Sequence, residues 1–224
     1  MSTTADRAAF AHPLFTPGMT IVDLGCGRSP ITAPPNARVI GVDLNPAPST
    51  VDHVTATAYA LPFATASIDA VFSHALFEHL ENPLAALTEI HRVLRPGGHL
   101  ALSTSDWSRA KLTPKTPNAT AALRGHYLLH RRQGGDPFYG RTAPTHVAAA
   151  GFTNIATRTK YREDHTYKNL ATHIKNALAA ALTNPPATDH DQLTSAARSA
   201  WSWHKSATTG DFAQCWQELT ATRP

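Results

Sequence analysis

The sequence has few of the features that mark secreted, membrane-spanning or disulfide-bonded proteins. Its 224 residues contain only two cysteines, Cys26 and Cys215, and residues 1–17 lack the apolar core of a signal peptide. No apolar run is long enough to cross a bilayer. We therefore expect free thiols, no membrane segment and a cytoplasmic location.

Dense positive charge is also missing. Charged residues make up 16% of the chain, and the formal net charge of +4 arises without any run of lysines and arginines. Such diffuse charge gives no reason to expect a nucleic acid partner. The thirteen histidines are scattered and not grouped at metal-ligand spacing, so we expect no bound metal. The 42% of hydrophobic residues is typical of one globular domain, which we expect to be a monomer or a homodimer.

Apolar strands alternate with helical segments in the first half of the chain, which predicts a doubly wound, mostly parallel α/β sheet. The predicted strands are residues 20–24, 39–43, 53–55, 68–73 and 99–103. Asn82 followed by Pro83 predicts the start of a helix, because asparagine caps helices and proline suits the first helical position. The Arg-Pro-Gly-Gly run at 95–98 predicts the end of that helix.

The pattern is less regular beyond residue 105. Residues 106–144 are rich in proline and glycine, and we interpret them as a long loop of the kind that forms a lid or binding segment. The Asn-Pro-Pro sequence at 184–186 predicts a second loop. The other elements predicted in this half are helices at 142–150, 168–182 and 189–204 and strands at 153–159 and 216–222.

The strongest functional signal is a glycine turn that follows a short apolar strand. Residues 23–27 read Asp-Leu-Gly-Cys-Gly, and residues 39–43 read Val-Ile-Gly-Val-Asp. In doubly wound sheets, such glycines let backbone N–H groups approach a nucleoside and the acid accepts the ribose hydroxyls. The glycines can equally turn the strand without a ligand, and Asp43 can equally cap a strand end. Pro30 disfavours a nicotinamide cofactor, because it stands where the dinucleotide fingerprint has its third glycine.

Three further segments follow the glycine turn in a fixed order. They are Ala-Leu-Pro-Phe at 60–63, Ser-Ile-Asp-Ala-Val at 67–71, and residues 76–98, which run from Leu-Phe-Glu-His-Leu to Arg-Pro-Gly-Gly. The whole series resembles the class I S-adenosylmethionine-dependent methyltransferases, in particular the small ubiquinone-biosynthesis-like group, methyltransferase type 11. The resemblance is tight over residues 20–105.

The resemblance implies a seven-stranded Rossmann-like methyltransferase sheet with a small helical cap, and S-adenosylmethionine as cofactor. Residues 1–19 are then a short N-terminal segment, and residues 20–224 form the methyltransferase domain with 106–144 and 161–209 as lid or cap insertions. The residues implied to bind the cofactor are Asp23, Gly25, Cys26, Gly27, Asp43, Leu44, Thr57, Ala58, Leu61, Ser73 and His74.

Individual roles also follow from the resemblance. Asp23 balances the methionine ammonium, Asp43 holds the ribose and Leu44 packs on the adenine. Leu61 is equally explicable as a core residue. Arg28 can pair with the methionine carboxylate or can face solvent.

Three departures from the family pattern concern the grip on the cofactor. Ser29 stands where the family often has a third glycine, and Thr57 stands where many members have an acid near the adenine amino group. Only eleven residues separate Gly27 from Val39, and three of them are prolines. We therefore expect the first crossover helix to be a short turn or absent.

His79 and Asp106 are the candidate catalytic residues, since both follow strands at the sheet edge where ligands bind. His79 can act as a general base, or can hydrogen-bond a neighbouring loop. Asp106 can orient an acceptor, or can simply end its strand. The candidate substrate contacts are Trp107, Tyr127, His130 and Tyr139.

We therefore expect an enzyme that transfers a methyl group to an O, N or C atom of a small molecule, in secondary or cofactor metabolism. In-line transfer needs alignment and desolvation more than a dedicated nucleophile. A second interpretation is a protein that keeps the cofactor site without methyl transfer, as a cyclisation catalyst or a sensor. Methylation of nucleic acid or protein is a third. The diffuse charge disfavours it, and so does the position of Asp-Pro-Phe-Tyr at 136–139, well past the fourth strand where amide-methylating enzymes carry that motif.

Overall fold

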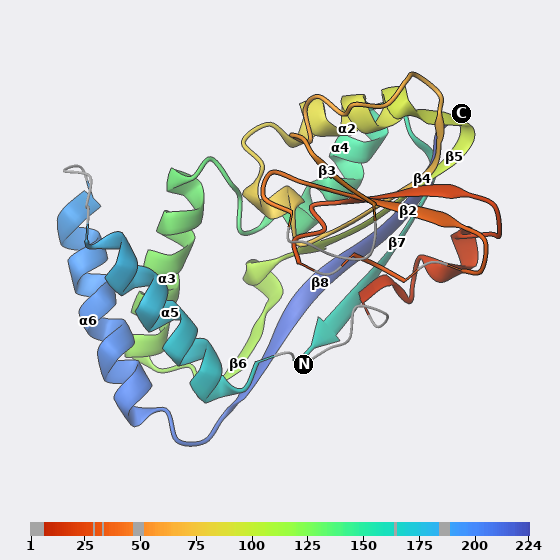
Figure 1. The fold of residues 1–224 in the computed structure, drawn as a ribbon. Coiled ribbons are helices and arrows are strands. Elements are labelled where there is room, and N and C mark those ends of the chain that lie inside the picture. The colour runs from red at the N-terminus through yellow and green to blue at the C-terminus, as the bar shows by residue number, and fades with distance from the viewer. Residues whose placement is uncertain (1–6, 29, 33, 47–51, 164, 184–188) are drawn as a thin grey trace. The chain divides into compact units, whose positions relative to one another are not determined.

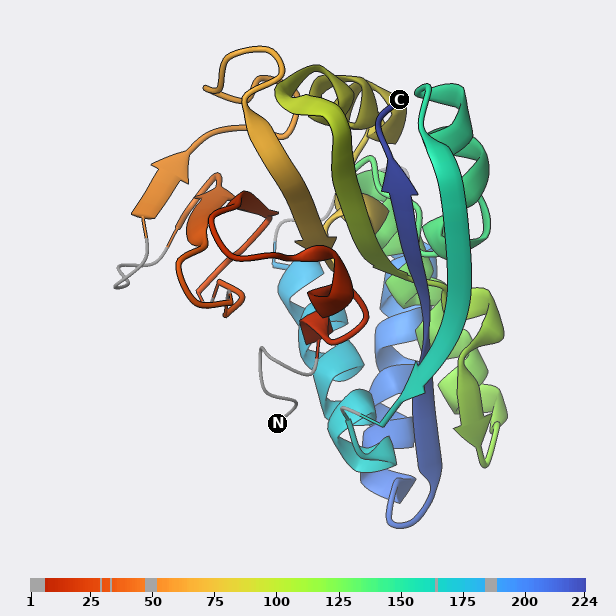
Figure 2. The same cartoon turned by 90° about the vertical axis from the view of Figure 1, so that its right-hand side faces the viewer.

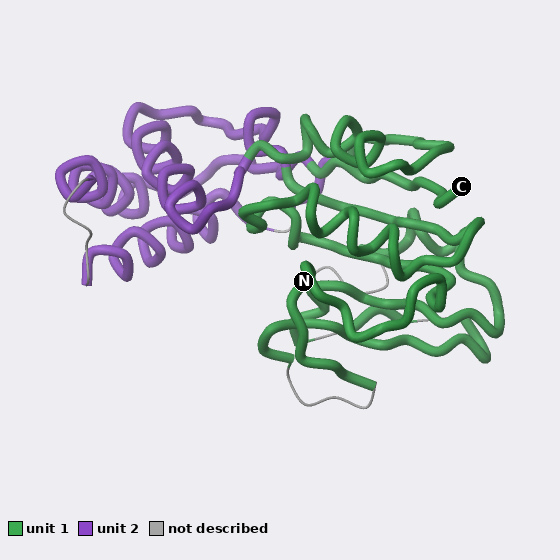
Figure 3. Tube along the Cα trace, turned by 90° about the horizontal axis from the view of Figure 1, so that it is seen from above, with its two compact units in different colours: residues 1–105, 138–160, 216–224 green, residues 106–137, 161–215 purple. Residues whose placement is uncertain are grey.

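The structure is a computed structural model that describes residues 7–28, 30–32, 34–46, 52–163, 165–183 and 189–224. The chain divides into two compact units (Figure 3). Unit 1 comprises Met1–Ser105, Phe138–Lys160 and Trp216–Pro224, and unit 2 comprises Asp106–Pro137 and Tyr161–Cys215. Each unit has its own hydrophobic core.

Unit 1 is built on a twisted sheet in which the first five strands run parallel (Figure 2). The strands are β1 (Thr20–Leu24), β2 (Arg38–Asp43), β3 (Asp52–Thr55), β4 (Ile68–His74), β5 (Leu94–Ser105), β7 (Thr153–Arg162) and β8 (Asp211–Thr222). Their order is β3-β2-β1-β4-β5-β8, with β7 paired to β8, and β8 runs antiparallel to β5. Since β2 and β4 flank β1 on opposite sides, the sheet has the switch point of a doubly wound fold, and the predicted α/β class is confirmed.

The central strands are buried because they are apolar on both faces. Four of the five residues of β1 and four of the six residues of β2 are buried. Val22 packs with the helices α2 (Pro83–Val93) and α4 (Ala143–Ala149) on one face (Figure 1). Ile21 points to the opposite face, where it packs in a cluster with Phe15 of the N-terminal segment.

Helix α2 begins as the sequence predicts. The Asn82 side chain accepts a hydrogen bond from the backbone N–H of Ala85 at 3.1 Å, and Pro83 is the first helical residue. Leu87 and Ile90 are buried on the inner face. The helix ends at Val93, and β5 begins at once, five residues before the predicted strand.

The crossover from β1 to β2 also follows the prediction. The described residues between 25 and 37 form turns and contain no helix. Ser29, the residue in place of a third glycine, lies outside the described residues. The described residues between Gly27 and β2 therefore do not form the crossover helix, as the three prolines predict.

The described residues of unit 2 form the α-helices α3 (Pro117–Arg132), α5 (Tyr167–Ala181) and α6 (His190–Ser206). Ile174 and Trp203 are buried where the helices meet. A Cβ atom on Gly125 of α3 would lie 2.3 Å from the Cβ atom of Ala196 on α6, so glycine is required for this close approach. The short strand β6 (Lys111–Thr113) pairs antiparallel with the first residues of β8.

The predicted loop over residues 106–144 is wrong, because its centre is the helix α3. Thr116 caps this helix by accepting a hydrogen bond from the N–H of Ala119 at 3.1 Å, and Pro117 is its first residue. Pro114 and Pro137 lie outside the helix, so the prolines flank it and do not interrupt it. The predicted helices at 168–182 and 189–204 are confirmed as α5 and α6 within two residues at each end. The predicted loop at 184–186 lies outside the described residues.

The helices that the structure describes are all too short or too polar to cross a membrane.

Candidate functional site

The glycine turn after β1 is fixed by backbone contacts with β2. The N–H groups of Gly25 and Cys26 both donate to the carbonyl oxygen of Val42, at 2.7 and 3.3 Å. Gly25 has φ +75° and Gly27 has φ +56°, in the left-handed region that favours glycine. A Cβ atom on Gly25 would also lie 3.0 Å from Cβ of Leu76. The sequence therefore needs glycine at position 25 for both conformation and space.

Asp43 closes this turn from the end of β2. One carboxylate oxygen accepts a hydrogen bond from the N–H of Gly27 at 3.0 Å, and the other accepts one from the N–H of Asn45 at 2.9 Å. Each oxygen keeps a second lone pair, which can accept a hydroxyl. Asp43 is half-buried, and the neighbouring Leu44 leaves 64% of its surface exposed. The carboxylate is therefore fixed in place and still able to accept hydrogen bonds from a diol.

A pocket of about 240 Å³, counting space open to solvent, lies beside the glycine turn. Its lining residues are Arg7, Asp23, Gly25, Cys26, Ile31, Phe72 and His74. The sequence predicted Asp23, Gly25, Cys26 and His74 as ligand contacts, and the structure brings these four together. It did not predict Arg7, Ile31 or Phe72, because no local motif marks them. Arg28 is exposed and is not among the lining residues.

Asp23 is the buried acid of this pocket. Only 4% of its surface is exposed, and one carboxylate oxygen accepts a hydrogen bond from the N–H of Ile31 at 2.8 Å. Burial raises the pKa of Asp23 to about 7, against the opposing effects of the Ile31 hydrogen bond and of the Arg7 cation. A carboxyl group of this kind is poised to ionise when a cation arrives beside it.

Cys26 is a packing residue of the turn. Burial raises the pKa of its thiol to about 12, and the carboxylates of Asp23 and Asp43 add to this effect. A Cβ atom on Gly41 would lie 2.9 Å from the Cys26 sulfur, so the thiol fills the space that Gly41 leaves. At neutral pH this cysteine is a neutral thiol and a poor nucleophile.

The end of β4 forms the opposite side of the switch point. The hydroxyl of Ser73 donates to the carbonyl oxygen of Leu24 at 2.9 Å and ties β4 to β1. His74 lines the pocket, and its ring stacks on Trp216 with 4.4 Å between centroids and 29° between planes. Ser73 is therefore fully buried, whereas His74 is half-buried and is a lining residue of the pocket.

Three predicted cofactor contacts lie in the segment that follows β3. Ala58 and Leu61 are buried in the core of unit 1, and the N–H of Leu61 donates to the Glu89 carboxylate at 2.7 Å. The Thr57 hydroxyl accepts a hydrogen bond from the N–H of Tyr59 at 3.4 Å. Their contact with a cofactor stays a prediction.

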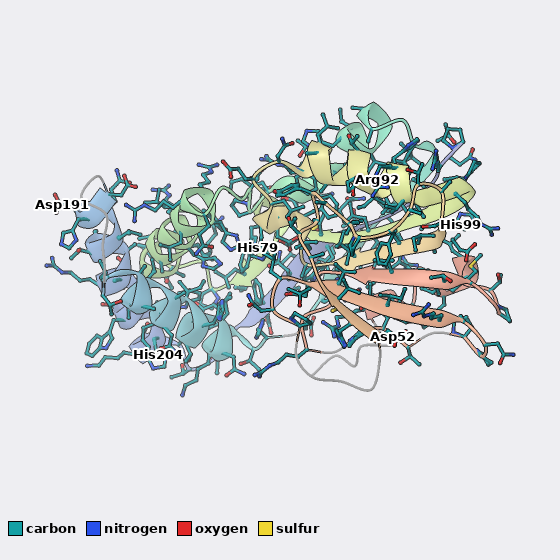
Figure 4. All side chains as sticks on the ribbon, turned by 45° about the horizontal axis from the view of Figure 1, so that its top comes forward. Asp52, His79, Arg92, His99, Asp191 and His204 are labelled. Atoms are coloured by element: carbon teal, nitrogen blue, oxygen red, sulfur yellow. The ribbon has the colours of Figure 1, made fainter. Side chains whose placement is uncertain are left out.

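The two candidate catalytic residues belong to different units. His79 ends the short helix η2 (Phe77–His79) in unit 1 and is exposed (Figure 4). Its neighbour Glu78 is buried and accepts hydrogen bonds from the Thr104 hydroxyl at 2.7 Å and the Ser105 N–H at 3.3 Å. The Glu78 carboxylate therefore joins η2 to the end of β5.

Asp106 in unit 2 is fully buried, and its carboxylate is bound by neighbouring residues of the same unit. It accepts a hydrogen bond from the N–H of Ser108 at 3.0 Å and forms an ion pair with Arg109 at 2.6 Å. These contacts cap the short helix η3 (Trp107–Arg109). Among the described residues, no group of three or more His, Cys, Asp or Glu side chains is placed to hold a metal ion.

The candidate substrate contacts also belong to different units. Trp107, Tyr127 and His130 belong to unit 2, where the rings of Trp107 and Tyr127 lie 6.0 Å apart. Burial raises the pKa of Tyr127 to about 12, with a contribution from Asp106. Tyr139 is instead a core residue of unit 1, 1% exposed and stacked on Phe77 at 5.8 Å. Burial and the Glu78 carboxylate raise the pKa of Tyr139, so its hydroxyl stays neutral.

The sheet order, with β2 and β4 on either side of β1, the glycine turn and the acid after β2 are features of the Rossmann-like methyltransferase fold. Residues 22–102 match the family model described as methyltransferase domain. The resemblance predicted from the sequence is confirmed.

One curated relative and two solved structures illustrate the match. The ubiquinone biosynthesis O-methyltransferase of Cereibacter sphaeroides is 34% identical over 107 residues, which are 41% of this chain and 43% of that protein. The phosphoethanolamine N-methyltransferase 2 of Haemonchus contortus, solved with S-adenosylhomocysteine, aligns with a TM-score of 0.57 at 15% identity, over 97% of this chain and 52% of that chain. The 4+2 cyclase SpnF aligns with a TM-score of 0.52 at 18% identity, over 99% of this chain and 79% of that chain.

The structural likenesses establish the fold. This chain spans between 31% and 52% of the length of the first curated relatives that it matches.

Proposed function

We propose that this chain is an S-adenosylmethionine-dependent methyltransferase that acts on a small-molecule acceptor. The observation that carries the proposal is the pocket beside the glycine turn, which places the buried Asp23 carboxylate and the Arg7 cation at the carboxyl end of β1. The match to the methyltransferase domain covers the same strands and supports this assignment.

The residues fit the chemical groups of the cofactor. Asp43 offers lone pairs on both oxygens to the two ribose hydroxyls, and Leu44 offers an exposed apolar surface to the adenine. The Asp23 carboxylate suits the methionine ammonium. When bound, S-adenosylmethionine supplies an electrophilic methyl group on a positively charged sulfur. Cys26 remains a neutral thiol, so it does not compete with the acceptor for that methyl group.

We propose the following for the methyl acceptor, for which the sequence carries no motif. Residues 106–144 and 161–209 contribute the acceptor contacts, with Trp107, Tyr127 and His130 as candidates. The acceptor atom is O, N or C, and the reaction belongs to secondary or cofactor metabolism in the cytoplasm. The protein acts as a monomer or homodimer without nucleic acid.

Mass spectrometry of small molecules that co-purify with the protein tests the cofactor assignment. We expect the mass of S-adenosylmethionine or S-adenosylhomocysteine, and a second ligand would identify the acceptor class. A different nucleotide bound at one equivalent would contradict the proposal.

The alternative function is cofactor binding without methyl transfer, as a cyclisation catalyst or a sensor. Incubation with S-adenosylmethionine and a panel of small hydroxy, amino and enol acceptors separates the two. A methyltransferase releases S-adenosylhomocysteine with at least one acceptor, whereas a binding protein releases none.

A further inference from the structure

The first residues of β8 place a glutamine beside an aromatic pair in unit 2. Phe212 and Gln214 are two residues apart on the strand, so their side chains lie on the same face. The backbone N–H of Asp106 donates to the carbonyl oxygen of Cys215 at 2.9 Å, which brings the next residue, Trp107, alongside this part of β8. The rings of Trp107 and Phe212 stack at 5.9 Å between centroids, with 25° between planes.

Helix α3 adds further rings to this pair. The ring of His126 lies 5.2 Å from the ring of Trp107, and the ring of Tyr127 lies 6.0 Å from it. His130 follows one turn later on α3, and its ring lies 4.8 Å from that of His126. All of these residues belong to unit 2. We call the following residues the Gln214 group: Trp107, His126, Tyr127, His130, Phe212 and Gln214.

The Gln214 group extends from the interior of unit 2 to its surface. Phe212 is 4% exposed, and His126 and Gln214 are each 6% exposed. The other three members are half-buried. Part of each of those three rings can therefore be reached from solvent.

The Gln214 side chain has an unused hydrogen-bond acceptor. Its amide N–H donates to the carbonyl oxygen of Cys215 at 3.2 Å, which fixes the orientation of the amide. Its buried Oε1 accepts no hydrogen bond from any residue that the structure describes. An acceptor that is buried without a donor costs about 1–3 kcal/mol, so such atoms are rare and frequently belong to functional sites. A ligand with an O–H or N–H group would satisfy this oxygen.

The Gln214 group favours an uncharged ligand. None of its six members carries a permanent charge, and burial raises the pKa of Tyr127 to about 12, so that hydroxyl stays neutral. Asp106 and Arg109, which lie close to Trp107 in sequence, form an ion pair with each other at 2.6 Å. A charged ligand would lose its hydration here without gaining a permanent counter-charge from the group, which is costly.

The rings determine the shape of the ligand. Aromatic side chains pack well against planar molecules, by stacking or by edge-to-face contact. We propose that the Gln214 group binds an uncharged planar ring of the methyl acceptor, and that Gln214 accepts a hydrogen bond from a hydroxyl or N–H group on that ring. This inference rests on the proposed function. Gln214 is then a specificity-determining residue, because it rewards ligands that carry the donor.

The test uses three small probes that share a naphthalene ring. 2-Naphthol carries a hydroxyl donor, 2-methoxynaphthalene keeps the ring and the oxygen without the donor, and 2-naphthoate carries a negative charge. Ligand-observed NMR titrations at pH 8 measure their dissociation constants for the full chain, with and without saturating S-adenosylhomocysteine. We expect 2-naphthol to bind about tenfold more tightly than 2-methoxynaphthalene, since the ether cannot donate to the buried oxygen. 2-Naphthoate should also bind more weakly than 2-naphthol.

Substitutions of Gln214 test whether it is the partner of the donor. Gln214→Met keeps the length of the side chain and removes the carbonyl oxygen, so 2-naphthol and its methyl ether should bind within about twofold of each other. Gln214→Asn keeps the amide on a shorter side chain and should retain only part of the preference. Gln217→Met is the matched control, because Gln217 is another buried glutamine of β8, and its amide donates to the carbonyl oxygen of Arg158 at 3.3 Å. It should prefer 2-naphthol as the full chain does.

Cooperative urea unfolding verifies that each variant is folded, and the comparison of probes on the full chain needs no variant. Equal affinity of the full chain for 2-naphthol and its methyl ether, tighter binding of 2-naphthoate, or an unchanged preference in Gln214→Met would overturn the inference. A chain that binds S-adenosylhomocysteine and none of the probes would also overturn it, and would leave the proposed function standing. If the chain binds no S-adenosylhomocysteine, the proposed function fails, and the assignment of the Gln214 group to the methyl acceptor fails with it.

Discussion

The backbone N–H of Gly27 donates a hydrogen bond to the carboxylate of Asp43 at 3.0 Å. This contact joins the turn after β1 to the end of β2, so the two motifs that the sequence places sixteen residues apart form one structure. It also orients the Asp43 carboxylate, whose remaining lone pairs face away from the backbone donors.

Asp43→Ala should lose cofactor affinity. Two charged hydrogen bonds to the ribose would disappear, which costs about 3–6 kcal/mol of binding free energy. We expect S-adenosylhomocysteine to give no shift in the thermal unfolding of this variant, whereas it stabilises the parent chain. Asp52→Ala is the control, because Asp52 (Figure 4) is an exposed acid on the adjacent strand β3. Its carboxylate forms an ion pair with Arg38 at 2.7 Å. An unchanged ligand-induced shift in Asp43→Ala would remove the ribose assignment.

The two glycines of the turn should differ in their tolerance of alanine. Gly25→Ala meets both the left-handed φ and the Leu76 side chain, whereas Gly27→Ala meets the left-handed φ alone. We expect Gly27→Ala to lower the free energy of unfolding by about 1 kcal/mol and Gly25→Ala by about 2–4 kcal/mol. Urea unfolding of the two variants measures this difference. A larger loss for Gly27→Ala would contradict the packing at Leu76.

Cofactor affinity should rise with pH through neutrality. The pKa of Asp23 is raised to about 7 mainly by burial, so below pH 7 the carboxyl group is mostly protonated. An ammonium ligand binds the ionised form and must displace that proton. We expect S-adenosylhomocysteine to bind about tenfold more weakly at pH 6 than at pH 8, with little change above pH 8.

Asp23→Asn is the control for this pH dependence. It cannot ionise, so it should bind weakly with the same affinity at both pH values. Calorimetry at pH 6, 7 and 8 on both proteins provides the comparison. A parent chain whose affinity is flat over this range would show that Asp23 does not meet the ammonium.

Alanine substitutions of Asp106 and His79 should change the free energy of unfolding by different amounts. Asp106 is fully buried and paired with Arg109, so Asp106→Ala should lower the free energy of unfolding by about 2 kcal/mol or more. His79 is exposed, and His79→Ala should change it by less than about 0.5 kcal/mol. Thermal and urea unfolding give both values. An unchanged free energy of unfolding in Asp106→Ala would contradict a structural role for Asp106 and leave a catalytic role as its explanation.

The sequence identified the part of the site that is local in the chain. Asp23, Gly25 and Cys26 follow one another at a strand end, and His74 ends the neighbouring strand. Strand order alone brings such positions to one edge of a parallel sheet, so they could be predicted without a structure.

The missed residues depend on how distant segments fold back. Arg7 reaches the pocket only because the N-terminal segment packs on Phe72, a contact between residues more than sixty positions apart. The sequence predicts Tyr139 as a substrate contact together with Tyr127 and His130, because the three are close in sequence. The chain passes from unit 2 to unit 1 between Pro137 and Phe138, so Tyr139 joins a different core.

The loop prediction failed for a reason visible in the helix itself. A segment with several prolines is predicted to be a loop, because proline breaks the interior of a helix. Pro117, however, is the first residue of α3, and proline is favoured at that position. The Ala- and Leu-rich stretch behind it then continues α3, which packs against the other helices of unit 2.

Isothermal titration calorimetry of the full chain with S-adenosylmethionine and S-adenosylhomocysteine tests whether the cofactor binds beside the glycine turn. We expect saturable binding of both ligands at one site per chain, and we expect Asp43→Ala to abolish it. No detectable heat with either ligand, from a protein whose folded state is verified by its cooperative unfolding, would contradict it.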